Sequence, residues 1–91
     1  MDKNEVNLYL LPESDDYPTM NIVVNGAQGV ISSTFSGISF EHLGSDFIDW
    51  FETRFLSPVD AFKFTLFGES EKCFSLYSEL YQKGARVSLV N

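Results

Sequence analysis

The sequence has few of the residues on which catalytic and metal-binding sites depend. It contains one histidine, His42, and one cysteine, Cys73, so no disulfide can form within the chain. Every histidine-dependent mechanism would rest on a single side chain, and no Gly-x-Ser-x-Gly sequence occurs. Small secreted domains usually need disulfides, so we expect a reducing compartment, the cytoplasm. These shortages favour a non-enzymatic protein that uses no cofactor and no metal.

Long apolar runs and clusters of basic residues are also missing. No stretch approaches the ~18 apolar residues of a membrane span, and the polar residues 2–5 do not resemble a signal peptide. We therefore expect no membrane association. Six Lys and Arg stand against thirteen Asp and Glu, for a net charge of −7. Direct nucleic-acid binding is disfavoured, because neutralising phosphates requires clustered basic side chains.

The acidic residues are concentrated in the first part of the chain. Residues 1–52 hold nine acids and one base, a net charge of −8, whereas residues 53–91 hold four acids and five bases, a net charge of +1. An acidic surface of this kind favours association with a protein partner, in particular a basic one.

Aromatic residues are plentiful, and they predict a folded core. Nine Phe, four Tyr and one Trp make up 15% of the 91 residues, a composition that does not suit disorder. The length suits one domain over residues 1–91. We expect a core rich in phenylalanine.

Alternating apolar residues predict strands over 6–11, 20–25, 30–35, 62–67 and 85–90. Asn25-Gly26 indicates a tight turn between the second and third strands, since both residues tolerate positive φ. The strand pattern also leaves a second set of apolar residues on the opposite sheet face. This set comprises Tyr9, Val23, Ile31, Phe35, Phe67 and Val90. Were that face exposed, a partner protein or a homodimer would be expected to cover it.

Two helices are predicted between these strands. Ser45 is a favourable N-cap for the first, which Pro58 stops. The second covers residues 70–83, followed by Gly84 as a C-terminal signal. Its apolar face is expected to comprise Cys73, Phe74, Tyr77, Leu80 and Tyr81. The predicted fold is an α+β two-layer sandwich in the order βββαβαβ, with a five-stranded mixed sheet and both helices on one face.

The acidic and large aromatic side chains of residues 1–52 include the residues best suited to bind a partner. The candidate partner-binding residues are Glu13, Asp15, Asp16, Tyr17, Asp49 and Trp50. Tyr17 follows an acidic segment between two prolines, and Trp is a frequent interface hot spot. Trp50 has a second interpretation as a residue that closes the rim of its own core.

One further grouping, Glu41, His42, Asp46 and Asp49, resembles a metal or acid–base site. Gly44-Ser45 indicates that the helix begins after His42, which breaks the helical alignment of these side chains. Cys73 is expected to be a buried structural residue.

Three functions remain open. The leading hypothesis is a small acidic non-catalytic binding or regulatory protein, of the inhibitor or immunity type. The alternatives are a homo-oligomeric structural domain and a small-ligand or metal-dependent domain around Glu41, His42 and Asp46.

Overall fold

The secondary-structure elements follow the predicted order βββαβαβ. The computed structural model describes residues 4–11, 17–26 and 29–90. The strands are β1 Glu5–Leu11, β2 Thr19–Gly26, β3 Gly29–Ser36, β4 Lys63–Phe67 and β5 Arg86–Val90. The helices are α1 Leu43–Phe55 and α2 Ser70–Gln82, with a 3-10 turn, η1, at Val59–Ala61.

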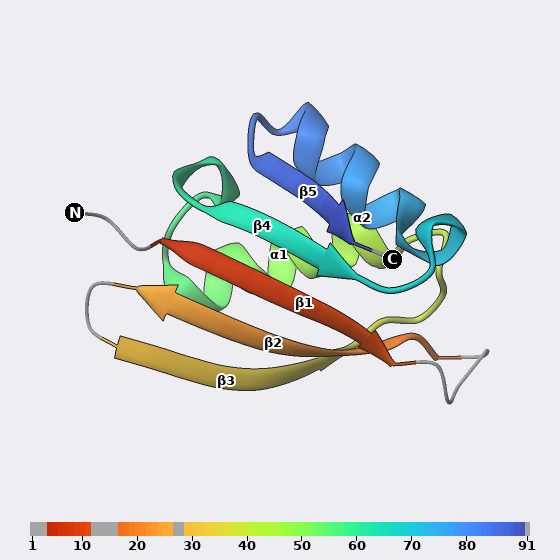
Figure 1. Cartoon of the computed structure of the whole chain (residues 1–91), viewed down its shortest axis with the longest axis horizontal. Coiled ribbons are helices and arrows are strands. Elements are labelled where there is room, and N and C mark those ends of the chain that lie inside the picture. The colour runs from red at the N-terminus through yellow and green to blue at the C-terminus, as the bar shows by residue number, and fades with distance from the viewer. Residues whose placement is uncertain (1–3, 12–16, 27–28, 91) are drawn as a thin grey trace.

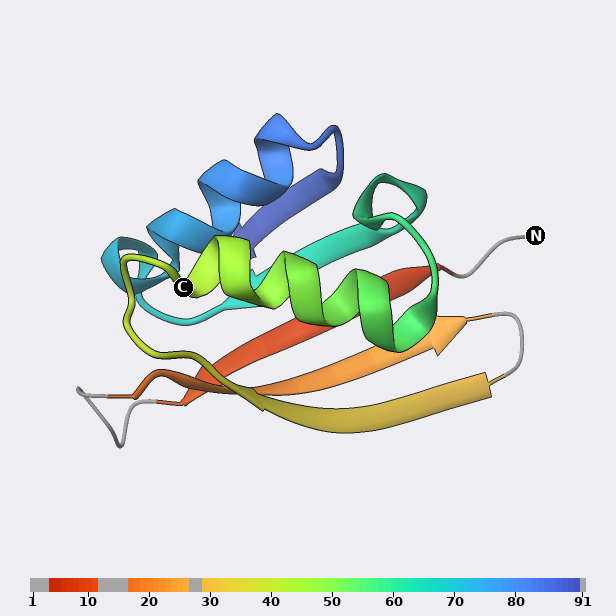
Figure 2. The same ribbon diagram turned by 180° about the vertical axis from the view of Figure 1, so that it is seen from behind.

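The five strands form one mixed sheet in the order β3-β2-β1-β4-β5. β1 is central, antiparallel to β2 and parallel to β4, and β5 runs parallel to β4. Both helices pack together on one face of this sheet (Figures 1 and 2). The predicted α+β fold, with its closing βαβ unit, is therefore confirmed.

The core lies between the sheet and the helices and is built on strand alternation. Val6 and Leu8 of β1 are buried, as are Met20 and Ile22 of β2 and Phe64 of β4. The register places Val6 beside Val24 and Phe64, and Leu8 beside Ile22 and Leu66, so equivalent residues of three strands face the helices together. The full core cluster also contains Leu43, Phe47, Ile48, Phe51, Val59, Phe62, Cys73, Leu76, Leu80 and Ala85.

α1 begins at Leu43, so the prediction of Ser45 as its N-cap was wrong. His42 is the N-cap, and Ser45 lies in the first turn, where its Oγ donates to the His42 carbonyl oxygen at 3.2 Å. The early start has a packing reason. Gly44 is buried against α2, and a Cβ at this position would collide with the carbonyl oxygen of Ser75. The glycine is a point of close helix contact and does not interrupt the helix.

α2 is rotated relative to its predicted orientation. Its buried residues are Cys73, Leu76 and Leu80, whereas Phe74 and Tyr81 are largely exposed. The prediction that these aromatic residues belong to the buried face was wrong. A helix advances about 100° per residue, so the aromatic residues form a separate stripe beside the buried one.

The open face of the sheet also differs in part from prediction. Tyr9 and Phe67 lie there as expected, with ring centroids 4.6 Å apart in a stacked arrangement. Ile31 and Phe35 do not, because they pair with Val24 and Met20, whose side chains face the helices. Because Gly26 pairs with Gly29, each even-numbered residue of β2 lies opposite an odd-numbered residue of β3. That register brings the odd-numbered residues of β3 to the helix side.

No helix in the described part of the chain is both long and apolar enough to cross a bilayer.

Candidate functional site

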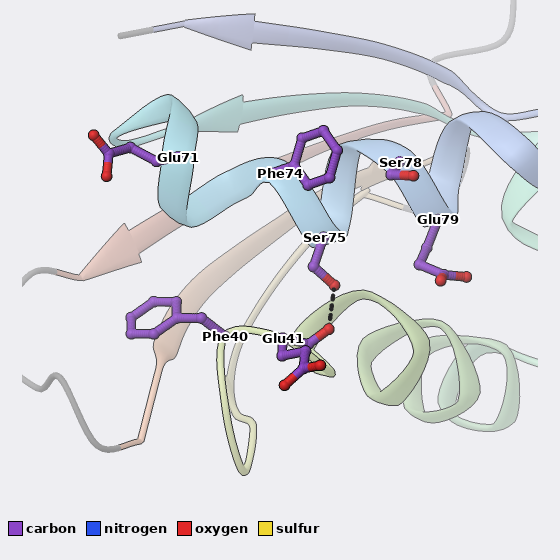
Figure 3. Close-up of a pocket in the computed structure, with 7 residues that line it drawn as sticks. All are labelled: Phe40, Glu41, Glu71, Phe74, Ser75, Ser78 and Glu79. Carbon is purple, nitrogen blue, oxygen red and sulfur yellow. Dashed lines mark hydrogen bonds between the residues drawn. The ribbon is translucent and has the colours of Figure 1, made fainter.

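A surface groove of about 350 Å³ lies where the segment before α1 meets α2. We call it the acidic groove, and it is shown in Figure 3. Its lining combines two phenyl rings, three carboxylates and two hydroxyls. The lining residues are Phe40, Glu41, Glu71, Phe74, Ser75, Ser78 and Glu79.

Ser75 holds the two sides of the groove together. Its Oγ donates to the Glu41 carbonyl oxygen at 3.1 Å and accepts the Gly44 backbone N–H at 2.9 Å (Figure 3). One hydroxyl therefore connects α2 to both the preceding segment and the first turn of α1. This fixes the backbone from which Phe40 and Glu41 project, so the groove floor is set by α1–α2 packing.

The two phenyl rings give the groove an apolar component. Phe40 is half-buried and packs against the core, whereas Phe74 is 71% exposed. Lys72 Nζ lies 5.5 Å from the centroid of the Phe40 ring, within the range of a cation–π contact. The Phe40 ring thus already accepts one ammonium group of this chain on its face.

Three carboxylates line the groove together with these rings. Glu41 and Glu71 are exposed and Glu79 is half-buried, and in Figure 3 they lie at different places around the groove. Lys72 Nζ also lies 3.6 Å from Glu69, so its charge is shared with a carboxylate outside the groove. The groove is therefore suited to accept hydrogen bonds from cationic groups.

Ser75 and Cys73 are not arranged for covalent chemistry. The Ser75 hydroxyl is engaged by two backbone groups. Cys73 is buried, and this burial raises the pKa of its thiol, to which the nearby Glu69 charge adds. A raised pKa disfavours the reactive thiolate, so Cys73 acts as a core residue, as predicted from the sequence.

The sequence-predicted binding residues lie elsewhere. Tyr17 is 64% exposed just before β2, and Asp49 is exposed on α1. Trp50 is half-buried, with its ring centroid 5.3 Å from that of Phe35 and 6.0 Å from that of Phe47. None of these three described residues lines the acidic groove. The remaining candidates, Glu13, Asp15 and Asp16, lie outside the described residues.

The histidine grouping takes on a local structural role. His42 Nδ1 shares a hydrogen bond of 3.1 Å with Ser39 Oγ, and the same hydroxyl accepts the His42 backbone N–H. Over residues 4–11, 17–26 and 29–90, no three His, Cys, Asp or Glu side chains are placed to hold a metal ion. These contacts shape the entry to α1.

Sequence reasoning did not identify the groove. The sequence groups Glu41 with His42, Asp46 and Asp49, and it predicts Phe74 on the buried face of its helix. The helical offset of Phe74 from the stripe of Cys73, Leu76 and Leu80 is a local signal that could have placed this ring outside. The Ser75–Gly44 contact joins residues 31 positions apart and has no local signal.

The chain matches no protein-family model, and a search of curated proteins likewise finds no match.

Proposed function

We propose that this chain is a small acidic, non-catalytic binding protein of the inhibitor or immunity type, and that it binds a basic segment of a protein partner in the acidic groove. The observation that carries the proposal is the grouping of Glu41, Glu71 and Glu79 around the rings of Phe40 and Phe74.

The chemistry of the groove favours arginine or lysine side chains over neutral ones. A guanidinium group can donate to a carboxylate while its plane stacks on a phenyl ring, and the groove offers three carboxylates and the exposed ring of Phe74. Exposed ion pairs contribute about 0.2–1 kcal/mol each, so several must act together to give useful affinity. A basic segment with two or more cationic side chains meets that requirement.

The charge distribution supports the same partner class. The first 52 residues have a net charge of −8 and supply Glu41, while Glu71 and Glu79 come from residues 53–91, whose net charge is +1. A negative surface potential speeds the encounter with a basic partner and is screened by salt. Binding by occlusion of a basic surface needs no catalytic group on this chain.

Tyr17, Asp49 and Trp50 remain a second candidate surface within the same proposal. Tyr17 and Asp49 present exposed side chains to a partner, whereas Trp50 offers only part of its ring. The two surfaces can be separated by mutation, because they share no residue.

Binding of a fluorescently labelled oligo-arginine peptide tests the groove. We expect saturable binding that weakens as salt rises, and little binding of an oligo-glutamate peptide. The double variant Glu41→Gln/Glu71→Gln should bind the peptide about tenfold more weakly, since it removes two groove carboxylates.

The matched control is Glu5→Gln/Asp60→Asn, which removes two exposed carboxylates that do not line the groove. Equal losses in the two double variants would show that only net charge matters, and would contradict the assignment to the groove. Loss confined to Asp49→Asn and Tyr17→Ala would move the binding site to the second surface.

A further inference from the structure

α2 carries an exposed stripe of three aromatic residues, of which only Phe74 also lines the acidic groove. We call Phe74, Tyr77 and Tyr81 the aromatic stripe; they are 71%, 36% and 67% exposed. The rings of Tyr77 and Tyr81 stack at 6.3 Å between centroids. At about 100° per residue, the stripe lies roughly 150° around the helix from Ser75 and Glu79, which face α1. It therefore lies on the flank of α2 that points away from α1.

An unpaired sheet edge lies along the same side of the molecule. β5 is the last strand of the sheet, paired only with β4 among the described strands. α2 lies along β5 at this edge (Figures 1 and 2). β5 has no proline to block strand pairing. An open backbone edge and an aromatic helix flank thus lie next to each other.

We infer that this edge binds a second copy of the chain, forming a two-fold symmetric dimer. A two-fold axis beside β5 and perpendicular to the sheet would pair β5 antiparallel with its symmetry mate and extend the sheet to both copies. The same axis sets the two α2 helices antiparallel. Their aromatic stripes then pack against each other.

Charge complementarity supports a second copy as the occupant. The antiparallel arrangement places the Lys83 and Arg86 end of one α2–β5 unit near the Glu69–Glu71 end of the other. Residues 53–91 have a net charge of +1, so two copies meet there without the repulsion expected between their acidic first parts. The opposite edge, β3, is rich in Ser and Thr, and the α1 rings beside it, Phe47 and Trp50, are buried and half-buried rather than exposed.

The exposed area is of the size a modest dimer needs. With about 200 Å² per aromatic side chain, the three exposed fractions leave about 350 Å² per protomer. Two protomers contribute about 700 Å² of the ~1,200–2,000 Å² in a typical specific interface. The edge of β5, the 43% exposed Val90 and the stems of Lys83 and Arg86 can provide the rest. We expect dissociation constants in the tens of micromolar.

Sedimentation velocity over a concentration series up to about 1 mM tests the dimer. The wild-type chain should shift from monomer to dimer, and Tyr81→Asp should raise the dissociation constant at least about tenfold. Tyr17→Asp is the matched control, because Tyr17 is 64% exposed and precedes β2, which β1 and β4 separate from β5. It adds the same charge and should change the constant less than about twofold.

Hydrogen exchange identifies the contact. Outward-facing amides of β5 should become more protected as wild-type concentration rises, and not in Tyr81→Asp. A chain that stays monomeric throughout, or a dimer equally sensitive to both tyrosine variants, would overturn the inference. The dimer goes beyond the proposed function, and the two proposals can fail separately. Tyr81 does not line the groove, and oligo-arginine binding is measured at low protein concentration.

Discussion

The two helices have the same length and comparable numbers of aromatic residues. The large rings of α1 are buried in or packed against the core, whereas those of α2 are mostly exposed on the surface. Each helix has 13 residues. Phe47 and Phe51 of α1 are fully buried, whereas Phe74 and Tyr81 of α2 are mostly exposed. Aromatic residues at helical spacing therefore do not by themselves identify a core face. The location of the helix over the sheet decides which stripe is buried.

The sheet explains the difference. The rings of α1 contact Phe35 of β3 and Phe64 of β4, strands on either side of the sheet centre. Large rings fill the space between a helix and the middle of a sheet. α2 lies along the edge strand β5, where Cys73, Leu76 and Leu80 are sufficient to close the core. Its aromatic residues are left to the surface, where both proposed contacts use them.

The rotation of α2 is tested most strongly by two neighbouring residues. Leu80→Ala should cost about 2–5 kcal/mol of unfolding free energy, because Leu80 is fully buried. Tyr81→Ala should change it by about 0.5 kcal/mol or less. Urea denaturation at low protein concentration measures both. Large losses for both variants would restore the orientation predicted from the sequence, in which Leu80 and Tyr81 both face the core.

The close approach of the helices predicts the next largest effect. Gly44→Ala should destabilise the fold by about 1–3 kcal/mol, since the added Cβ overlaps the Ser75 carbonyl. Gly26→Ala is a suitable control, because a Cβ there meets only Asn4 Oδ1 at 3.9 Å. If thermal melting showed equal losses for the two variants, the tight helix contact would be refuted.

The smallest expected effect is a pH dependence of the unfolding free energy caused by Cys73. Burial raises the pKa of its thiol in the folded state, so the contribution is fully present below the unfolded pKa of about 8.5 and declines as pH rises through the folded value. One group can change stability by at most about 1.4 kcal/mol per pH unit. Denaturation of wild type and Cys73→Val between about pH 7 and 10 should show the steeper decline in wild type. Parallel pH profiles would disprove the effect.

Local sequence patterns were sufficient to predict the order of helices and strands. They did not always predict which residues of an element face the core. Alternation identified Val6, Leu8 and Ile22 correctly, because β1 and β2 keep the same parity toward the helices. It failed at Ile31 and Phe35, since the pairing of Gly26 with Gly29 places the odd-numbered residues of β3 on the helix side, and the alternation pattern does not determine this register.

The start of α1 and the groove could not be read from local signals. Glycine is unfavourable inside a helix, so Gly44 suggested that the helix begins after it. Only its contact with Ser75 shows why it lies inside α1. Glu41 and Glu79 are 38 positions apart and meet at the groove only through α1–α2 packing. Tyr17, Asp49 and Trp50 remain predictions that the binding experiments address.

The most direct test of the contrast between the helices is one substitution made in each. Phe51→Ala in α1 and Phe74→Ala in α2 delete the same atoms, and urea denaturation at low micromolar concentration compares their unfolding free energies. Phe51 is 0% exposed and Phe74 71% exposed, so we expect a loss of about 3–5 kcal/mol for the first and about 0.5 kcal/mol or less for the second. Similar losses in the two variants would contradict the account.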